Sequence, residues 1–175
     1  TYKPTKDYLG NNTSGRTATF LLKNGIKLYG SFAGTETSLG NRTSSVIAAN
    51  ATILSGDLGT LNDNTDNAYH VVIAGGLNSL SGASIFDGFT ITKGNANVGG
   101  SISVSGVTIQ QTNGGGLVNA NCTYSPTNLI IESNNATTEG GGVYSNSNGT
   151  ITFSNGILRS NSAGAGGGMY TTATN

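Results

Sequence analysis

The feature that most constrains this chain is a glycine triplet that recurs at one fixed interval. Each triplet is followed by an apolar residue and then by Val or Tyr, and the copies begin at Gly114, Gly140 and Gly166. The two intervals are equal, since 140 − 114 = 26 and 166 − 140 = 26. Such a period is typical of a solenoid, in which each repeat stacks on the one before it. About 26 residues suit three short strands and three turns, at ~3.3 Å per strand residue.

A second pattern, an isoleucine four residues before an asparagine, repeats at the same interval. It occurs at Ile131 and Asn135 and at Ile157 and Asn161, with weaker upstream copies at Ile91 and Asn95 and at Ile109 and Asn113. We expect Ile131 and Ile157 to stack as an aliphatic row inside the fold, and the asparagines to form a hydrogen-bonded ladder at a corner. The glycine triplet then marks another corner, where neighbouring backbones lie close and a positive φ is needed.

Composition and local patterns favour strands. The chain is rich in Gly, Asn, Ser and Thr, which are poor residues for helix interiors. Apolar and polar residues alternate in segments 26–32, 89–92 and 102–104, as they do in half-buried strands. Recurrent Ile, Val, Thr, Tyr and Phe argue against disorder. The sequence therefore predicts an all-β chain, a right-handed parallel β-helix with about 26 residues per regular turn.

Charged residues are scarce and unevenly distributed. They make up 9% of the chain and the formal net charge is zero, which argues against nucleic acid or an anionic membrane surface as a partner. Of the 16 Asp, Glu, Lys and Arg residues, 13 lie at or before Lys93. We therefore expect a single β-helix segment over residues 1–175, irregular over 1–93 and regular over 94–175. The irregular part is expected to carry loops at 7–15, 35–45 and 59–67.

The ends of the sequence lead to a further expectation. The chain lacks an initiator methionine, and its last repeat has only the ten residues 166–175. No apolar run reaches the ~18–20 residues of a membrane span, and the first residues do not form a secretory signal. We expect the ordered part of a longer mature protein, with no membrane insertion of this segment.

Several segments resemble a known family. "LKNGIKLYGSFAGTET", "ATILSGDLG", "NAYHVVIA" and "FDGFTITKGNA" resemble bacterial secreted right-handed parallel β-helix proteins, especially the long surface proteins and adhesins of Bacteroidota. "LRSNSAGAGGGMY" is similar to the repeats of polymorphic outer membrane proteins, with Leu158 in place of Phe and Gly168 in place of Ala. The resemblance implies an extracellular or cell-surface location. It also implies a parent protein with a signal peptide, a sorting or anchoring domain and contacts with secretion machinery.

The segment "GDLGTLNDNTDNAYH" is the best candidate for a metal site. Its oxygen-bearing residues are of the kind that calcium prefers, and they are Asp57, Asp63, Asp66, Asn62, Asn64 and Asn67. The calcium-loop template fails, because Ala68 and Ala74 stand where its Gly and Glu belong. Asp and Asn also build turns without a metal. Both interpretations remain open, and we assign no metal ligand and no cofactor.

Two single residues have structural interpretations. Cys122 is the only cysteine, so the chain forms no internal disulfide, and we expect a small half-buried or turn thiol. His70 is the only histidine, and no Ser or Cys motif accompanies it. We expect a strand residue with both ring nitrogens hydrogen-bonded rather than a catalytic base.

Three classes of function share the predicted fold. We expect a noncatalytic module of an adhesin, which contacts surface polysaccharides or other cell-surface components. The alternative is a polysaccharide lyase or glycoside hydrolase of the β-helix type, because the fold alone does not set the function. The third class is ice binding, which pairs such as Thr90 and Thr92 would suggest. An ice-binding face needs threonine pairs at the same position in successive repeats. Tyr124 and Pro126 occupy the positions one repeat before Thr150 and Thr152, so this requirement is not met there.

The carboxylates bear on the choice between module and enzyme. Glycoside hydrolysis needs two carboxyl groups about 5–9.5 Å apart on one face. The only acids in the regular part are Glu132 and Glu139, which we expect on different sides of one turn. Two carboxylates could come together only among the upstream acids, which have Lys93 or His70 nearby in sequence. These acids are Asp57, Asp63, Asp66 and Asp87. We assign no catalytic residue.

Overall fold

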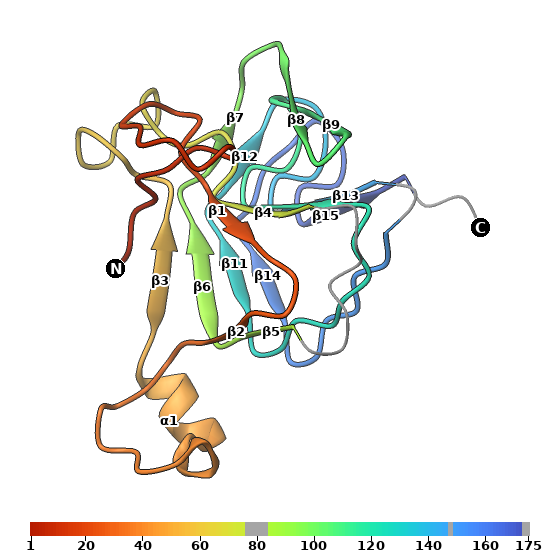
Figure 1. Ribbon diagram of the computed structural model, residues 1–175. Helices are drawn as coiled ribbons and strands as arrows, with labels where there is room; N and C mark the ends of the chain where they lie inside the picture. The colour runs from red at the N-terminus through yellow and green to blue at the C-terminus, as the bar shows by residue number, and fades with distance from the viewer. Residues whose placement is uncertain (76–83, 147–148, 173–175) are drawn as a thin grey trace.

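The computed structural model describes residues 1–75, 84–146 and 149–172 (Figure 1). Within these ranges the chain consists mostly of short strands that form several small parallel sheets, with little helix. The prediction of an all-β chain is confirmed. No helix in the described part of the chain is long and apolar enough to cross a membrane.

The first large sheet, called sheet A, has four parallel strands that lie side by side in Figure 1. They are β3 (Thr52–Ser55), β6 (Phe89–Thr92), β11 (Ile130–Glu132) and β14 (Ile157–Arg159). The inward row of this sheet joins Leu54, Ile91, Ile131 and Leu158. The outward row beside it joins Ile53, Thr90, Ile130 and Ile157.

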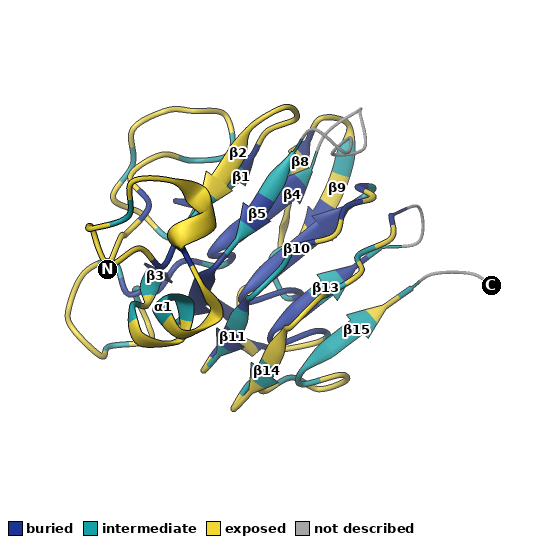
Figure 2. Cartoon of the chain, turned by 90° about the horizontal axis from the view of Figure 1, so that it is seen from below, coloured by how far each residue is buried: buried dark blue, intermediate teal, exposed yellow. Residues whose placement is uncertain are grey.

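The second large sheet, called sheet B, has five parallel strands in the order β1-β4-β10-β13-β15. They are β1 (Phe20–Leu22), β4 (Val72–Gly75), β10 (Leu117–Ala120), β13 (Val143–Ser145) and β15 (Met169–Thr171). Sheets A and B share one core, because Val72, Leu117 and Val143 belong to the same apolar cluster as Ile91 and Ile131. Figure 2 shows that β10, in the middle of sheet B, is more buried than β15 at its edge.

The other strands form three two-stranded ladders. β2 (Lys27–Tyr29) pairs with β5 (Ile85–Asp87), and β7 (Asn95–Ala96) pairs with β12 (Asn135–Ala136), both in parallel. β8 (Ser101–Val104) and β9 (Val107–Gln110) form an antiparallel hairpin. Its Ile109 packs with Ile73 and Val118 on the outer face of sheet B. The interpretation of Ile109 and Asn113 as a weaker copy of the repeat is therefore wrong, because Ile109 pairs antiparallel within a hairpin.

The loop predictions hold in two of three places. Segments 7–15 and 59–67 consist of turns, bends and isolated bridges. Segment 35–45 instead contains η1 (Leu39–Asn41) and the start of α1 (Ser44–Ala49), a helix that the sequence did not predict. Thr43 precedes α1, and its side chain accepts a hydrogen bond from the Val46 backbone N–H, which caps the helix. Within the described residues, α1 lies at the amino ends of β3 and β6 (Figure 1).

The spacing of the repeat differs between the two large sheets, and this corrects one core prediction. In sheet B, Leu117 pairs with Val143, so the shift is 143 − 117 = 26, whereas in sheet A Ile131 pairs with Leu158, so the shift is 158 − 131 = 27. Asn119 pairs with Ser145, and further along Tyr124 pairs with Ile151. The chain advances five residues from Asn119 to Tyr124 (124 − 119 = 5) but six from Ser145 to Ile151 (151 − 145 = 6), so the register shifts by one residue. Leu158 therefore continues the inward row, and Ile157 faces outward with 48% of its surface exposed.

The asparagine corner exists, but Asn95 and Asn135 both lie one residue beyond it, in a neighbouring ladder. Asn134 is 1% exposed, and its Oδ1 accepts a hydrogen bond from the Gly94 N–H at 2.9 Å. Asn161 occupies the next position, because its Oδ1 accepts from the Asn134 N–H at 3.0 Å. Asn135 points outward and pairs with Asn95 in the β7–β12 ladder. The corner ladder is thus Asn134 and Asn161.

The glycine corner is as predicted. Gly114, Gly140 and Gly166 have φ values of 71°, 63° and 60°, in the left-handed region that favours glycine. A Cβ on the second glycine of the first triplet, Gly115, would collide with the backbone carbonyl oxygen of Asn135. A Cβ on the third glycine, Gly116, would likewise collide with the backbone carbonyl oxygen of Gly142, so all three positions of the first triplet exclude a side chain.

A polar groove beside the Asp-rich loop

A polar groove of about 390 Å³ lies at the carboxyl end of sheet A. One wall is the loop that follows β3, and the other is formed by the corners that follow β6 and β11. The lining residues are Asn62, Asp63, Asn64, Asn67, Lys93, Gly94, Asn95, Ser133 and Asn135. The groove therefore brings part of the Asp-rich segment singled out in the sequence against the stacked repeats.

The aspartates of this segment hold the shape of the loop. Asp57 is buried, its Oδ2 accepts from the Asn62 N–H at 3.0 Å, and its Oδ1 lies 3.5 Å from the Lys3 ammonium. Asp66 Oδ2 accepts from the Thr60 N–H at 2.6 Å. Each of these carboxylates thus satisfies a different turn of the loop, as Asp residues commonly do.

Asp63 is the aspartate that faces the groove. Its Oδ1 accepts from the side chain and the N–H of Thr65 at 2.7 and 2.9 Å. These two hydrogen bonds hold the pKa of Asp63 below its usual value, the side-chain bond contributing most. Among the described residues, no group of three or more His, Cys, Asp or Glu side chains could hold a metal ion.

Two side-chain oxygens of the loop have no protein partner. Asn67 is 3% exposed and lines the groove, and its Oδ1 has no hydrogen-bond partner in the described part of the chain. The same holds for the Oδ1 of Asp66. A buried acceptor without a partner is rare in proteins, so each of these enclosed oxygens is a place where a single water molecule would bind favourably.

The opposite wall is a set of amides in fixed positions. Asn95 donates through Nδ2 to the Asn64 carbonyl at 2.7 Å, and Asn135 donates through Nδ2 to Asn95 Oδ1 at 2.9 Å. Lys93 donates through Nζ to Asn62 Oδ1 at 3.3 Å, which links the two walls. Sequence reasoning missed Asn95 and Asn135 as lining residues, although their place in the isoleucine–asparagine repeat already put them on equivalent corners.

The remaining upstream acid does not join the groove. Asp87 comes just before β6, at the amino end of sheet A, where its Oδ2 accepts from Arg42 Nη1 at 2.8 Å. Asp57 follows β3, at the opposite end of the same parallel sheet. The upstream acids therefore do not all converge.

The two downstream glutamates lie on different sides, as predicted. Glu132 belongs to sheet A and forms an ion pair with Arg159 at 2.6 Å. Glu139 belongs to a separate ladder between Asn113 and Ala165, and its Oε2 accepts from Asn113 Nδ2 at 3.0 Å. Neither glutamate is stacked on another acid in its own row.

His70 and the threonine pair fill structural roles. His70 is buried just before β4, and its Nδ1 lies 3.0 Å from the Gly114 carbonyl oxygen, while Nε2 has no partner among the described residues. The prediction of a strand position with both nitrogens bonded is wrong. Burial lowers the pKa of His70 to about 4. Thr90 faces outward, but its neighbours in the row are Ile53 and Ile130, so no threonine row forms there.

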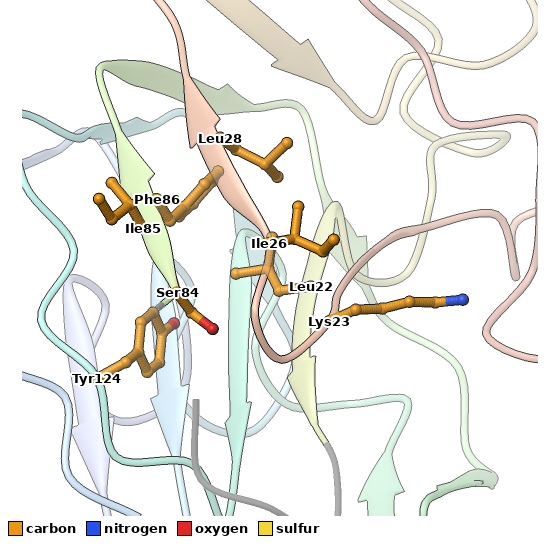
Figure 3. A pocket seen from close by; sticks show the side chains of 8 residues that line it. All are labelled: Leu22, Lys23, Ile26, Leu28, Ser84, Ile85, Phe86 and Tyr124. Carbon is orange, nitrogen blue, oxygen red and sulfur yellow. The ribbon is translucent and has the colours of Figure 1, made fainter. Parts of the chain in front are cut away.

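A second hollow, drawn in Figure 3, is too small to be a binding site. It lies between the turn after β1, strand β5 and the ring of Tyr124, and its volume is about 10 Å³. A space of that size holds about one water molecule. The buried Tyr124 hydroxyl has no hydrogen-bond partner in the described residues, so a water in this hollow would form a hydrogen bond with it.

No family model, no curated protein and no solved structure matches this chain.

Proposed function

We propose that this chain is a noncatalytic module of an extracellular or cell-surface protein, and that its polar groove binds polysaccharide. We further propose that its sheets are the faces of a right-handed parallel β-helix. Two features support that fold: sheets A and B take their strands in the same chain order, and parallel crossovers are right-handed in nearly all proteins. The surface location and a parent adhesin rest on the resemblance of segments such as "LKNGIKLYGSFAGTET" to secreted β-helix proteins.

The observation that carries the proposal is the lining of the polar groove. Amide, hydroxyl and ammonium groups face a space of about 390 Å³, within the range typical of small-ligand sites. Sugars present many hydroxyl groups, each of which can donate and accept a hydrogen bond, and they match such a surface. The exposed amides of Asn62 and Asn135 offer groups of this kind on opposite walls.

The carboxylates favour binding over hydrolysis. The loop aspartates accept hydrogen bonds from backbone N–H groups or from Thr65, so their role is to stabilise the loop. A shallow site of this kind binds weakly on its own, and repeated contacts along a polymer would raise the avidity.

The test is a titration of the purified protein with a panel of neutral and acidic polysaccharides, with and without calcium. Saturable binding is expected. Asn135→Ala should weaken it about three- to tenfold, the range for one lost hydrogen bond, while Leu39→Ser, in η1 towards the opposite end of sheet A, leaves it unchanged. Reducing ends and unsaturated products are followed in the same samples. Turnover that disappears in Asp63→Ala would instead support the lyase or hydrolase alternative.

A further inference from the structure

A second groove of about 410 Å³ lies at the other end of sheet A, under helix α1. We call it the α1 groove. Its floor is the outer face of β6, β11 and β14, and its wall is α1 with the chain that leads into β3. Its apolar lining includes Ile47, Ile130 and Ile157, and its polar lining includes Asn128 and Asn155.

The floor of the α1 groove is aliphatic, although it faces outward. Ile130 and Ile157 are neighbours in the outward row of sheet A, and Ile157 is 48% exposed. Ile47 of α1 lines the groove from the side. Solvated faces of sheets normally carry polar residues, so an exposed isoleucine beside the half-buried Ile130 in a hollow marks a contact surface.

The wall is held rigidly by a buried arginine. Arg42 is 8% exposed, and it donates through Nη1 to Asp87 at 2.8 Å and through Nε to the Gly30 carbonyl at 2.5 Å. Ser31 Oγ donates to the Gly88 carbonyl at 2.8 Å. The groove is thus formed before any ligand arrives, which lowers the entropy cost of binding.

A row of amides forms the polar rim of the floor. Asn128 donates through Nδ2 to Asp87 Oδ1 at 2.7 Å, and Asn155 donates through Nδ2 to Asn128 Oδ1 at 3.4 Å. Both asparagines have positive φ values, 51° and 52°, so they occupy equivalent corners of successive repeats. The Oδ1 of Asn155 accepts no hydrogen bond from the described residues and is available to a ligand.

No lining residue of the α1 groove carries a charge, so the groove matches an uncharged ligand with one apolar patch and adjacent hydroxyls. We propose that the α1 groove binds a neutral 6-deoxyhexose residue, with its methyl group on Ile130 and Ile157 and its hydroxyls on Asn128 and Asn155. This inference rests on the proposed function. Thr90 of this groove and Lys93 of the polar groove are three residues apart, ~10 Å along the sheet, so one oligosaccharide can contact both.

The experiment compares methyl α-L-fucoside with methyl α-L-galactoside, which differ only in a methyl in place of a hydroxymethyl group. Binding is measured by calorimetry and by saturation-transfer NMR on the full chain. We expect the fucoside to bind at least about fourfold more tightly, the factor for burying one methyl group. We also expect saturation to be strongest at the sugar methyl.

Three variants locate the binding. Ile157→Ser and Asn155→Ala change exposed side chains and should each weaken fucoside binding, whereas Val98→Ser, at 39% exposed on a remote turn, should not. Circular dichroism confirms that the variants are folded. Equal affinity for the two glycosides, or wild-type affinity in Ile157→Ser, overturns the inference. Two other results also overturn it: a dimer that forms without fucoside, or an aliphatic peptide that binds more tightly than the fucoside, if Ile157→Ser abolishes that dimer or that peptide binding.

Failure of this inference and failure of the proposed function give different results. If polysaccharide binding is lost in Asn135→Ala but no fucoside binds, the polar groove stands and the α1 assignment falls. If the fucoside binds as described but no polysaccharide does, the α1 assignment stands alone.

Discussion

At the scale of single residues, one position of register decides which side chains stabilise the stack. Asn134 and Asn135 are neighbours in sequence, but Asn134 is buried and bonded to backbone of adjacent repeats, whereas Asn135 is exposed in the polar groove. Ile131 and Ile157 differ in the same way. The sequence pattern found the right residue types at the corners. It could not find the slip in sheet A, because one more residue before Ile151 leaves the glycine period unchanged.

The two asparagines give a first prediction. Asn134→Ala should lower the free energy of unfolding by about 1–3 kcal/mol, because it leaves the Gly94 N–H buried without its partner. Asn135→Ala should change it by less than about 0.5 kcal/mol, as is usual for exposed sites. Urea unfolding followed by circular dichroism measures both. Equal losses in the two variants would show that the corner ladder is misassigned.

The two isoleucines give a second prediction. Ile131→Ala should cost about 2–5 kcal/mol, because it opens a cavity in a fully buried row. Ile157→Ala removes an outward side chain and should cost about 0.5 kcal/mol or less. Thermal unfolding of the pair is the measurement, and a larger loss in Ile157→Ala would contradict the longer spacing of sheet A.

The buried histidine gives a third prediction, on pH. The pKa of His70 is about 4 in the folded chain, below the ordinary value of 6.5, so the unfolded chain binds the proton first. Stability is therefore complete above pH 6.5 and falls as the pH drops towards 4, by about 1.4 kcal/mol per pH unit at most. His70→Gln should flatten this slope between pH 6.5 and 4.5 in urea titrations. An unchanged slope in the variant would mean that other groups cause it.

At the scale of elements, the sequence predicted a strand over 102–104, within β8, but neither helix α1 nor the antiparallel pairing of β8 with β9, because tertiary contacts hold both. α1 has only six residues, too few to be stable alone, and the excursion that contains it is tied to sheet A through Arg42 and Asp87. The hairpin is held by packing of Ile109 on Val118. The polar groove was half predictable: the Asp-rich loop was visible, but the corner residues opposite it depend on how the repeats stack.

The ion pair under α1 gives a fourth prediction. Arg42→Met should cost about 3–5 kcal/mol, because it leaves the Asp87 carboxylate largely buried without its partner. Arg159→Met is the matched control, since its side chain is 58% exposed and such a pair contributes about 1 kcal/mol or less. Urea unfolding gives the two values, and hydrogen exchange across residues 43–50 reports whether α1 stays docked. Equal losses of stability in the two variants would contradict a special role for the Arg42–Asp87 ion pair in holding α1.

At the scale of the whole molecule, segments that are distant in sequence form one surface, the polar groove. Residues 62–67, 93–95 and 133–135 belong to three parts of the chain, and only the parallel stacking of β3, β6 and β11 brings them together. The proposed glycan site exists only if that stacking is correct. Fold and function are therefore testable together.

The most direct test is hydrogen exchange with and without a saturating polysaccharide that binds in the titration. We predict that bound polysaccharide slows hydrogen exchange in residues 62–67, 93–95 and 133–135 together, while exchange in β13 and β15 of sheet B stays unchanged. Protection confined to one segment, or centred on sheet B, would contradict the claim that these residues form a polysaccharide-binding groove.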